Sequence, residues 1–308
     1  LTDSRDIYPG ALFVALPGER YDGHDFIDDA IGDGAAAALV SVRKKCDTTP
    51  VVVVEDTITA LRDLAVMRRS ELNIPVVAVT GSTGKTSTKD ILASVLPGSW
   101  ASKASFNNQI GVPLTVLSTP NDARYLVVEV GAREVGDIRW LADAVRPDVA
   151  IITNLGLVHL ETFGTPEKLL LAKWELMESL RSGGIAIVPK FEDRFPVYRG
   201  GPTVSFGDTP DANVWYSDVS LDESAKPSFT LWHEDGCHSV KMSMAGGHQP
   251  VNAAAAMAAA SALGVNVEQI IAGLESAEAS PGRMEIHRGS VTVINDAYNA
   301  NPDSMEAA

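Results

Sequence analysis

A glycine-rich turn that ends in lysine and threonine interrupts an apolar stretch of the chain. Residues 76–87 read V-V-A-V-T-G-S-T-G-K-T-S, and we predict a buried strand over 74–79 and a helix over 86–96 on either side of the turn. Backbone N–H groups in such a turn, together with the positive end of a helix dipole, bind anions. In such a site we expect Lys85 to reach the terminal phosphates of a nucleotide and the Thr86 hydroxyl to bind Mg²⁺.

This turn is a shortened form of the usual phosphate-binding loop. The usual pattern has a glycine five residues before its second glycine, and that position here is Val79, which leaves G-x-x-G-K-T. One interpretation is a turn that binds no ligand. Because a buried strand, the glycines, Lys-Thr and a helix occur together, the sequence favours a nucleotide site.

Two later strands are predicted to end in polar residues. Glu129 ends the apolar run over 125–130, and carboxylates are rarely buried without a partner. Ligands bind at the carboxyl ends of strands in an open parallel sheet, so we expect Glu129 to face a metal ion. The strand over 148–154 is followed by a loop that holds His159, which is either a solvated side chain or a metal or phosphate contact.

Lys173 lies on the apolar face of a predicted helix over 166–180. Thr165 is the expected N-cap, and Pro166 suits the first turn. The lysine is three or four residues from four apolar side chains: Leu169, Leu170, Leu176 and Met177. It either extends its ammonium to water or is buried. Burial would raise the neutral fraction of the amine, which is the form that adds CO₂ to become a carbamate.

Asparagines precede or begin two further predicted helices. Asn107 and Asn108 lie in a loop before an apolar helix, where they act either as caps or as ligand contacts. Asn252 lies near the start of an alanine-rich helix that Pro250 opens, and it is a ligand candidate.

The composition is that of an α/β protein with an acidic surface. The chain has 308 residues, 45% of them hydrophobic, and a net charge of −15, which argues against a nucleic-acid partner. Anionic ligands must therefore be bound locally. Cys46 and Cys237 are far apart and form no zinc or disulfide pattern, which suits a cytoplasmic protein. No leader or membrane segment is expected, and because the chain starts without Met and stops within a helix-like run, we expect it to be part of a longer one.

The sequence divides into three predicted units. Residues 1–73 alternate short strands and turns. The polar pair Ser4-Arg5 there is either part of a surface loop or a contact for a ligand. Residues 74–284 alternate strands and helices, which predicts a parallel sheet covered on both faces, with a β-rich stretch over 204–240. Residues 280–289 read as a linker, and a strand over 291–295 begins a third unit too short to bury a core.

The motifs, taken in chain order, resemble the Mur ligase family, the ATP-dependent enzymes that add amino acids to the peptidoglycan precursor. The stretches that carry the resemblance are D-S-R, D-G-H-D-F, T-G-S-T-G-K-T-S, V-E-V-G-A, T-N-L-G-L-V-H-L, A-K-W-E, G-G-H-Q-P-V-N and P-G-R-M. Three others resemble the family member that adds D-alanyl-D-alanine: S-F-N-N-Q-I-G-V-P-L-T, V-G-A-R-E-V-G-D-I and D-A-Y-N-A-N-P-D-S-M.

The resemblance implies an α/β fold with three domains. Residues 1–73 would form a small N-terminal α/β domain that binds the UDP-precursor, and 74–284 a central P-loop parallel-sheet ATPase domain. Residues 285–308 would be only the start of a C-terminal Rossmann-like ligase domain. By this division we expect the chain to bind ATP and the UDP-precursor, and not to join the dipeptide at a useful rate.

The resemblance also assigns roles to individual residues. The nucleotide phosphates would be bound by Thr80, Gly81, Ser82, Thr83, Gly84, Lys85, Thr86 and Ser87. Mg²⁺ would be held by Thr86, Glu129 and His159, with a carbamylated Lys173 helping to place it; Lys85, Lys173 and His159 would be catalytic. Further ATP contacts would come from Asn252, Arg283, Asp296 and Asn299, and the precursor would meet Ser4, Arg5, Asn107 and Asn108. Gln249 stands where the family commonly has Asn, which puts that contact in doubt.

The implied reaction joins D-alanyl-D-alanine to UDP-N-acetylmuramoyl-tripeptide through an acyl phosphate, in a monomer without nucleic-acid or membrane partners. Three alternatives remain open: a Mur-type ligase that adds a single amino acid, a non-catalytic P-loop nucleotide-binding protein, and a small-molecule kinase. Lys173 and the first unit favour a ligase, because no kinase mechanism requires a carbamate.

Overall fold

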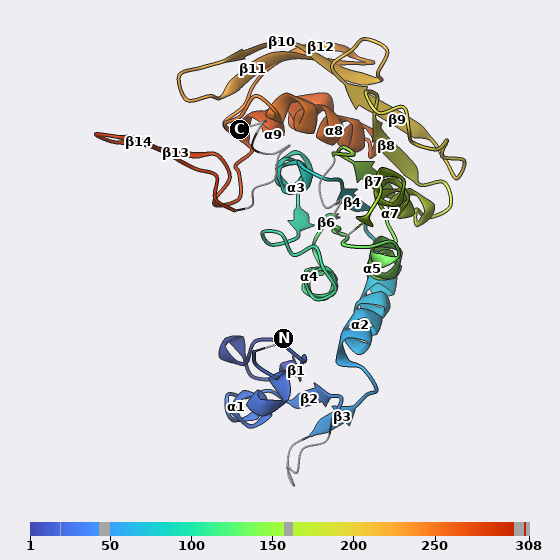
Figure 1. Ribbon diagram of the computed structural model, residues 1–308, viewed down its shortest axis with the longest axis vertical. Helices are drawn as coiled ribbons and strands as arrows, with labels where there is room; N and C mark the ends of the chain where they lie inside the picture. Colours follow the sequence, from blue (N-terminus) through green and yellow to red (C-terminus); the bar gives the residue numbers. More distant parts are fainter. Residues whose placement is uncertain (19, 43–49, 157–162, 299–304, 306–308) are drawn as a thin grey trace. The chain divides into compact units, whose positions relative to one another are not determined.

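The computed structural model describes residues 1–18, 20–42, 50–156, 163–298 and 305. It divides into two compact units, Leu1–Ser70 and Glu71–Ala308 (Figure 1). The sequence places the first boundary three residues later, and it separates the last 24 residues, which the structure groups with the second unit. None of the helices in the described part of the chain has the length and apolar character needed to cross a bilayer.

The first unit is a small parallel sheet with helices. Its described strands run in the order β1 (Leu12–Val14), β2 (Ala37–Val40) and β3 (Val51–Val53), as the apolar runs predict. The helical elements are η1 (Ser4–Asp6), η2 (Gly23–Phe26), α1 (Ile27–Gly32) and α2 (Thr57–Glu71). Phe13 and Val40 from the sheet pack with Ile27 and Ala30 of α1 to form the core.

The second unit is built on a mixed sheet. In the described residues its strands lie in the order β12-β11-β10-β9-β8-β7-β4-β6-β5. The bounds are β4 (Val76–Thr80), β5 (Ser99–Ala101), β6 (Tyr125–Glu129), β7 (Val149–Ile152), β8 (Ile185–Pro189), β9 (Thr203–Gly207), β10 (Val214–Leu221), β11 (Pro227–His233) and β12 (Gly236–Lys241). Strands β4 to β10 run parallel to one another, as predicted, whereas β11, in the stretch predicted to be β-rich, is antiparallel to both neighbours.

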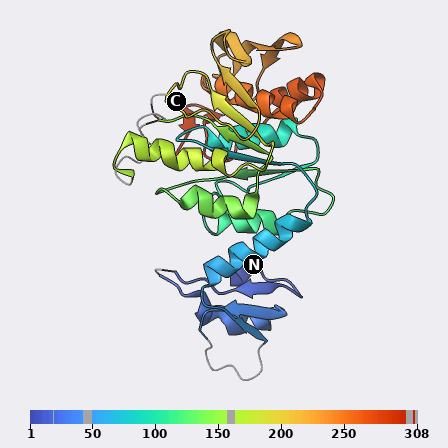
Figure 2. The ribbon, with the colours of Figure 1, turned by 90° about the vertical axis from the view of Figure 1, so that its right-hand side faces the viewer.

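Helices cover both faces of this sheet, as predicted (Figure 2). One group is α3 (Lys85–Val95), α8 (Gln249–Ala262) and α9 (Val267–Ser276), and the other is α4 (Gly111–Leu117), α5 (Asp137–Val145) and α7 (Pro166–Glu178). The interior strand β4, between β7 and β6, is buried along its whole length, because alternate side chains face the two groups. The alanines of α8 other than Ala262 are almost fully buried, and their small side chains let the helix lie close to α3 and the sheet.

The chain continues into a separate hairpin. Strands β13 (Glu285–Arg288) and β14 (Thr292–Asn295) pair antiparallel, so the linker predicted over 280–289 is partly a strand, and the strand predicted after it has a partner. Arg288 donates to the carbonyl of Glu223 and to the Ser224 hydroxyl, which ties the hairpin to the β10–β11 turn. The stretch E-I-H-R has a single aliphatic side chain, which explains why its sequence does not read as a strand.

Candidate functional site

The predicted phosphate-binding loop lies between β4 and α3, and we call it the phosphate-type loop. Its two glycines, Gly81 and Gly84, are required by their surroundings. Gly81 has φ of 147°, and a Cβ there would lie 1.9 Å from the Thr153 hydroxyl oxygen. Gly84 has φ of 77°, and a Cβ there would lie 2.6 Å from Oδ1 of Asn252. Any side chain at either position would displace the neighbouring strand end or helix, so the short loop is shaped by close packing.

The end of β7 holds the loop in place. Asn154 Oδ1 accepts hydrogen bonds from the backbone N–H groups of Ser82 (3.1 Å) and Thr83 (3.0 Å). The Thr153 hydroxyl donates to the carbonyl of Thr83 at 2.5 Å. Sequence reasoning missed these two residues as loop supports, although two polar residues directly after a buried strand were a usable signal.

Lys85 folds back over the loop at the start of α3. Its Nζ donates to the carbonyls of Gly81 (2.8 Å) and Ser82 (3.0 Å). Burial lowers the pKa of Lys85, nearby Glu129 opposes that shift, and Arg283 adds to it. The ammonium is therefore held at the loop opening beside a second cation.

Thr86 and Glu129 meet at the tips of α3 and β6. The Thr86 hydroxyl donates to one carboxylate oxygen of Glu129 at 2.7 Å, and Asn107 Nδ2 donates to the other at 2.6 Å. Glu129 is 1% exposed, so its hydrogen bonds satisfy the buried carboxylate as the sequence argument requires. A hydroxyl and a carboxylate are oxygen donors of the kind that Mg²⁺ binds when most of its other ligands are water and phosphate, so these residues fit that ion.

Arg283 reaches the same point from the segment after α9. Its Nη2 donates to the Thr86 hydroxyl at 2.9 Å, and its guanidinium lies 4.5 Å from the ring centroid of Tyr298. Its buried Nε has no hydrogen-bond partner among the described residues. The arginine therefore keeps unused donor capacity beside Thr86 and Glu129.

Asn252 lies where α8 approaches α3. Its Oδ1 accepts from the Thr88 hydroxyl at 3.3 Å, and its Nδ2 donates to Oε1 of Gln249 at 3.1 Å. Gln249 in turn donates from Nε2 to the carbonyl of Ala245 at 3.2 Å. The Gln249 side chain thus orients Asn252 next to Gly84.

Lys173 is buried, which rules out the interpretation that its ammonium extends to water. The residue is 2% exposed, and its Nζ lies 5.9 Å from the ring centroid of Phe163. Burial chiefly, and then the charge of Lys85, lowers the pKa of Lys173 from 10.5 to about 7, while Asp137 opposes the shift. Close to pH 7 a large share of this amine is therefore neutral.

Glu175, two residues along α7, fixes the helix that carries Lys173. Its buried carboxylate accepts from the backbone N–H groups of Gly136 (2.7 Å) and Arg139 (3.0 Å) at the start of α5. A carboxylate at a helix N-terminus satisfies orphan donors and complements the helix dipole. Sequence reasoning missed this contact because the partner amides belong to another helix.

Several predicted site residues make local contacts. Asn108 Oδ1 accepts from the N–H groups of Ile110 and Gly111 and caps the turn before α4. Asp296 Oδ1 accepts from the N–H of Met284 at 3.1 Å. His159 and Asn299 lie outside the described residues.

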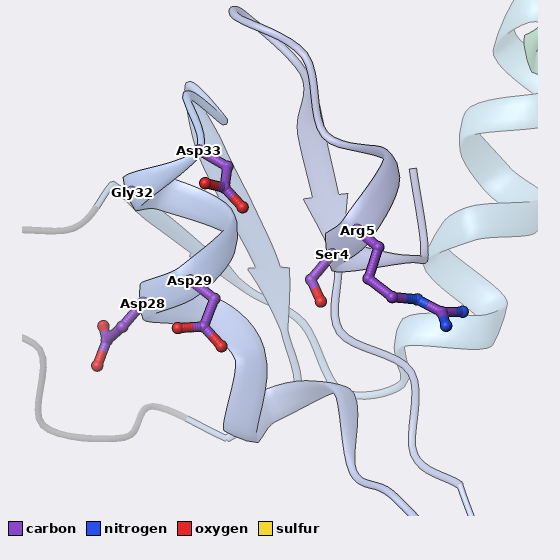
Figure 3. A pocket seen from close by; sticks show the side chains of 6 residues that line it. All are labelled: Ser4, Arg5, Asp28, Asp29, Gly32 and Asp33. Carbon is purple, nitrogen blue, oxygen red and sulfur yellow. The ribbon is translucent and has the colours of Figure 1, made fainter.

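Ser4 and Arg5 lie in the first unit, at an open pocket of about 490 Å³ between η1 and α1 (Figure 3). The other residues that line it are Asp28, Asp29, Gly32 and Asp33. Arg5 extends away from α1 and pairs with Asp3 at 2.6 Å, which lowers the pKa of Asp3 to about 2. The side chains of this pocket are thus mainly acidic.

The fold and the site define a class: a P-loop protein whose phosphate-type loop lies at the carboxyl end of an interior strand of an α/β sheet. Two family models match the chain. The Mur ligase middle domain matches residues 79–260, and the catalytic domain of the Mur ligase family matches residues 1–84. The chain belongs to the Mur ligase family.

Individual relatives agree with this membership. The chain is 39% identical to UDP-N-acetylmuramoyl-tripeptide--D-alanyl-D-alanine ligase of Mycobacterium bovis, over 99% of this chain and 66% of that relative. A crystal structure of MurF from Acinetobacter baumannii superposes with a TM-score of 0.92 at 36% identity, over 100% of this chain and 69% of that one. MurF of Thermotoga maritima in complex with ADP gives a TM-score of 0.88 at 33% identity, over 100% and 72%. The chain thus spans about two thirds of the length of these relatives.

Proposed function

We propose that the protein that carries this chain is an ATP-dependent ligase that adds D-alanyl-D-alanine to UDP-N-acetylmuramoyl-tripeptide. The reaction would pass through an acyl phosphate and would supply the peptidoglycan precursor in the cytoplasm. The relatives named for this reaction match the chain almost from end to end, which supports the choice of substrates.

The observation that carries the proposal is the gathering of cations around one carboxylate. Arg283 lowers the pKa of Lys85 while Glu129 raises it, and Arg283 donates to the Thr86 hydroxyl that bonds Glu129, within a chain whose net charge is −15. Like charges held together in a buried place are unfavourable unless an anion enters between them. A nucleotide triphosphate on the loop supplies that anion.

The nucleotide would be bound by the loop and by the residues that surround it. The loop, from Thr80 to Ser87, would receive the phosphates through its backbone N–H groups, with Lys85 at the terminal phosphate. Asn252 at Gly84 and Arg283 beside Thr86 would add contacts, and Asp296 would support the Arg283 segment through Met284. Asn299 stays a prediction from the family resemblance.

Thr86 and Glu129 would hold Mg²⁺, with His159 as a further predicted ligand. The ion would supply positive charge to the transferring phosphoryl group. Lys173 as a carbamate would present a carboxylate to the same place, and its largely neutral amine near pH 7 is the form that reacts with CO₂. The hydrogen bonds of Glu175 would keep α7 in the rotation that points Lys173 inward.

The chemistry of the substrates explains why these charges are needed. A peptide carboxylate is a poor electrophile, so the γ-phosphate of ATP would first pass to it and form an acyl phosphate. The amine of D-alanyl-D-alanine would then attack the acyl carbon, and phosphate would leave. Each step brings anions together, and the fixed cations Lys85 and Arg283 would offset their repulsion.

Four residues are candidates for contact with the UDP-precursor. Ser4 and Arg5 would contact it from the first unit, while Asn107, already bonded to Glu129, and Asn108 would contact it from the second. We expect the protein to be a monomer, as the family resemblance implies.

The test is phosphate release and product formation with ATP, UDP-N-acetylmuramoyl-tripeptide and D-alanyl-D-alanine, with one component omitted at a time. We expect release to require the UDP-precursor, and amide product to require all three. Phosphate transfer to an alcohol without the dipeptide would identify a kinase. Stable ATP binding without phosphate release under any combination would identify a non-catalytic protein. Equal turnover with a single amino acid would shift the assignment to another Mur-type ligase.

A further inference from the structure

Two adjacent charged residues of α3 lie one helical turn after Thr86, and Lys89 is buried and Asp90 mostly buried. Lys89 and Asp90 follow it by three and four residues, so all three side chains share one side of the helix. The side chains of Lys89 and Asp90 are 3% and 11% exposed, and Lys89 Nζ lies 2.6 Å from Asp90 Oδ1. Lysine and aspartate are almost never buried to this degree unless they are paired, and this pair has further partners.

Lys89 holds the segment that carries Ser105 and Asn107. Its Nζ donates to the carbonyls of Ser102 (3.1 Å) and Ala104 (3.3 Å). Ala104 has φ of 45°, a left-handed conformation that is unfavourable for a residue with a side chain. The lysine bond therefore stabilises a bend that brings Ser105 Oγ to 3.2 Å from Thr86 Oγ1. We name residues 102–107 the asparagine arm.

Asp90 holds the segment that carries Arg283. Its two oxygens accept from the backbone N–H (2.9 Å) and the hydroxyl (3.0 Å) of Ser280. Three residues later, Arg283 donates to the Thr86 hydroxyl at 2.9 Å. We name residues 280–284 the arginine arm. One carboxylate, itself fixed by Lys89, thus anchors a segment that lies 190 residues away along the chain.

We infer that Lys89 and Asp90 are positioning residues that hold the asparagine arm and the arginine arm on either side of Thr86 and Glu129, and that Asp90 acts on nucleotide binding through Arg283. Among the described residues, neither side chain has a hydrogen bond or ion pair with the phosphate-type loop or with the Thr86 and Glu129 side chains, so their effect travels through the arms. The inference rests on the proposed function only for the identity of the ligand, a magnesium nucleotide.

The experiment is a double-mutant cycle in the protein that carries this chain. Asp90→Asn keeps the side-chain volume but removes the charge and one acceptor of Ser280. We measure the dissociation constant of Mg-ADP by titration calorimetry in the parent, Asp90→Asn, Arg283→Ala and the double variant. Hydrogen exchange of the segment around Ser280 is measured in the same proteins. Asp143→Asn, an exposed aspartate on α5, is the matched control.

We expect Asp90→Asn to weaken Mg-ADP binding about 10-fold in the parent, because charged hydrogen bonds that fix the arginine arm are lost. In the Arg283→Ala background the same change should have less than about a 2-fold effect, because the arm no longer carries the contact. Exchange of the Ser280 segment should rise in both backgrounds. Ser280→Ala, which keeps the backbone bond and removes only the hydroxyl, should weaken binding about 3-fold.

Equal weakening by Asp90→Asn in both backgrounds would overturn the inference, since it would show a general effect on the fold. Unchanged exchange at Ser280 would overturn it as well. If Asp90→Asn does not fold, the cycle of Ser280→Ala with Arg283→Ala decides in the same way. If the parent binds no Mg-ADP, the proposed function fails, and increased exchange of the arginine arm in Asp90→Asn still tests whether Asp90 anchors it.

Discussion

Two polar regions of this chain differ in how their side chains are arranged. At the phosphate-type loop, Glu129 is 1% exposed and hydrogen-bonded on both oxygens, and the cations around it are fixed by carbonyls or hydroxyls. At the pocket of the first unit, three aspartates face water and Arg5, exposed at 86% of its side chain, is paired with Asp3. Buried and mutually bonded charge, rather than a hollow surface, distinguishes the place where chemistry is expected.

The same difference predicts unequal consequences of substitution. Charges in the buried region act at low effective dielectric and cannot be replaced by water. Charges in the exposed pocket are screened and contribute little individually. The changes below should therefore fall from orders of magnitude in the first region to a few-fold in the second.

The largest effect is expected for Lys85→Ala. The substitution removes the cation at the loop, so phosphate release should fall about 10³-fold, comparable to the loss of a key charge-stabilising donor. Steady-state phosphate release at saturating ATP checks this. Lys168→Ala, an exposed lysine on α7, is the control and should keep parental activity. A loss below 10-fold in Lys85→Ala would contradict a phosphate role.

Glu129→Ala should lower the rate of phosphate release about 10²-fold at low Mg²⁺, and the rate should recover as the metal concentration rises. The substitution removes a ligand of the metal ion, whereas Lys85→Ala removes a cation that binds the phosphates. Activity titrated against Mg²⁺ in both variants separates the two roles. Raising Mg²⁺ should help Glu129→Ala and leave Lys85→Ala unchanged. Equal recovery of both variants would mean that Glu129 serves mainly to hold Thr86 and Asn107.

Lys173→Ala should keep nucleotide binding within a few-fold but lose most ligation, roughly 10-fold or more, if a carbamate helps to place the metal. Short carboxylic acids such as acetate should restore part of the activity, because they can occupy the place of the carbamate. The measurement is ligation rate against acetate concentration, with Lys168→Ala in the same buffers as control. Full activity of Lys173→Ala without any additive would contradict the carbamate.

The burial of Lys173 also predicts a pH-dependent stability. The pKa is about 7 in the folded chain against 10.5 for the ordinary amine, so the unfolded state binds more protons between these values. Lys173 therefore lowers the free energy of unfolding by its full amount below pH 7, and this destabilisation disappears as the pH rises to 10.5. The free energy of unfolding changes by at most about 1.4 kcal/mol per pH unit in this range. Urea unfolding of the parent and Lys173→Met, in buffers free of metal and bicarbonate, measures it. A stability difference that does not shrink with rising pH would contradict a depressed pKa.

The sequence predicted the parts of the site that leave a local signal. The glycine pattern marked the loop, an acid after an apolar run marked Glu129, and helical spacing marked Lys173. The supports were not predictable in this way. Asn154 bonds to Ser82 across 72 residues, Glu175 to Gly136 across 39, and Asp90 to Ser280 across 190.

The fold was predicted with similar limits. Strand and helix alternation identified a parallel sheet and the helices on its two faces, but it did not assign the antiparallel pairs of β11. The dipeptide Asp235-Gly236, within the β-rich stretch over 204–240, is a hairpin signal, and β11 and β12 pair antiparallel there with His233 opposite Gly236. The β13–β14 hairpin was missed because a strand with few apolar residues has little periodicity to detect.

The smallest effect is expected in the pocket of the first unit. Arg5→Ala should weaken binding of the UDP-precursor by less than about 10-fold and leave Mg-ADP binding unchanged, because an exposed arginine already paired with Asp3 contributes little. Asp28→Asn, on the opposite wall, should tighten precursor binding slightly, since it reduces the repulsion of a diphosphate. Both shifts should shrink at high salt. Titration of each variant with the precursor and with Mg-ADP, at two ionic strengths, measures the dissociation constants that the comparison needs. A loss of 10²-fold or more in Arg5→Ala would show that Arg5 leaves Asp3 and is desolvated when the precursor binds, and the contrast between the two regions would then hold only for the unbound chain.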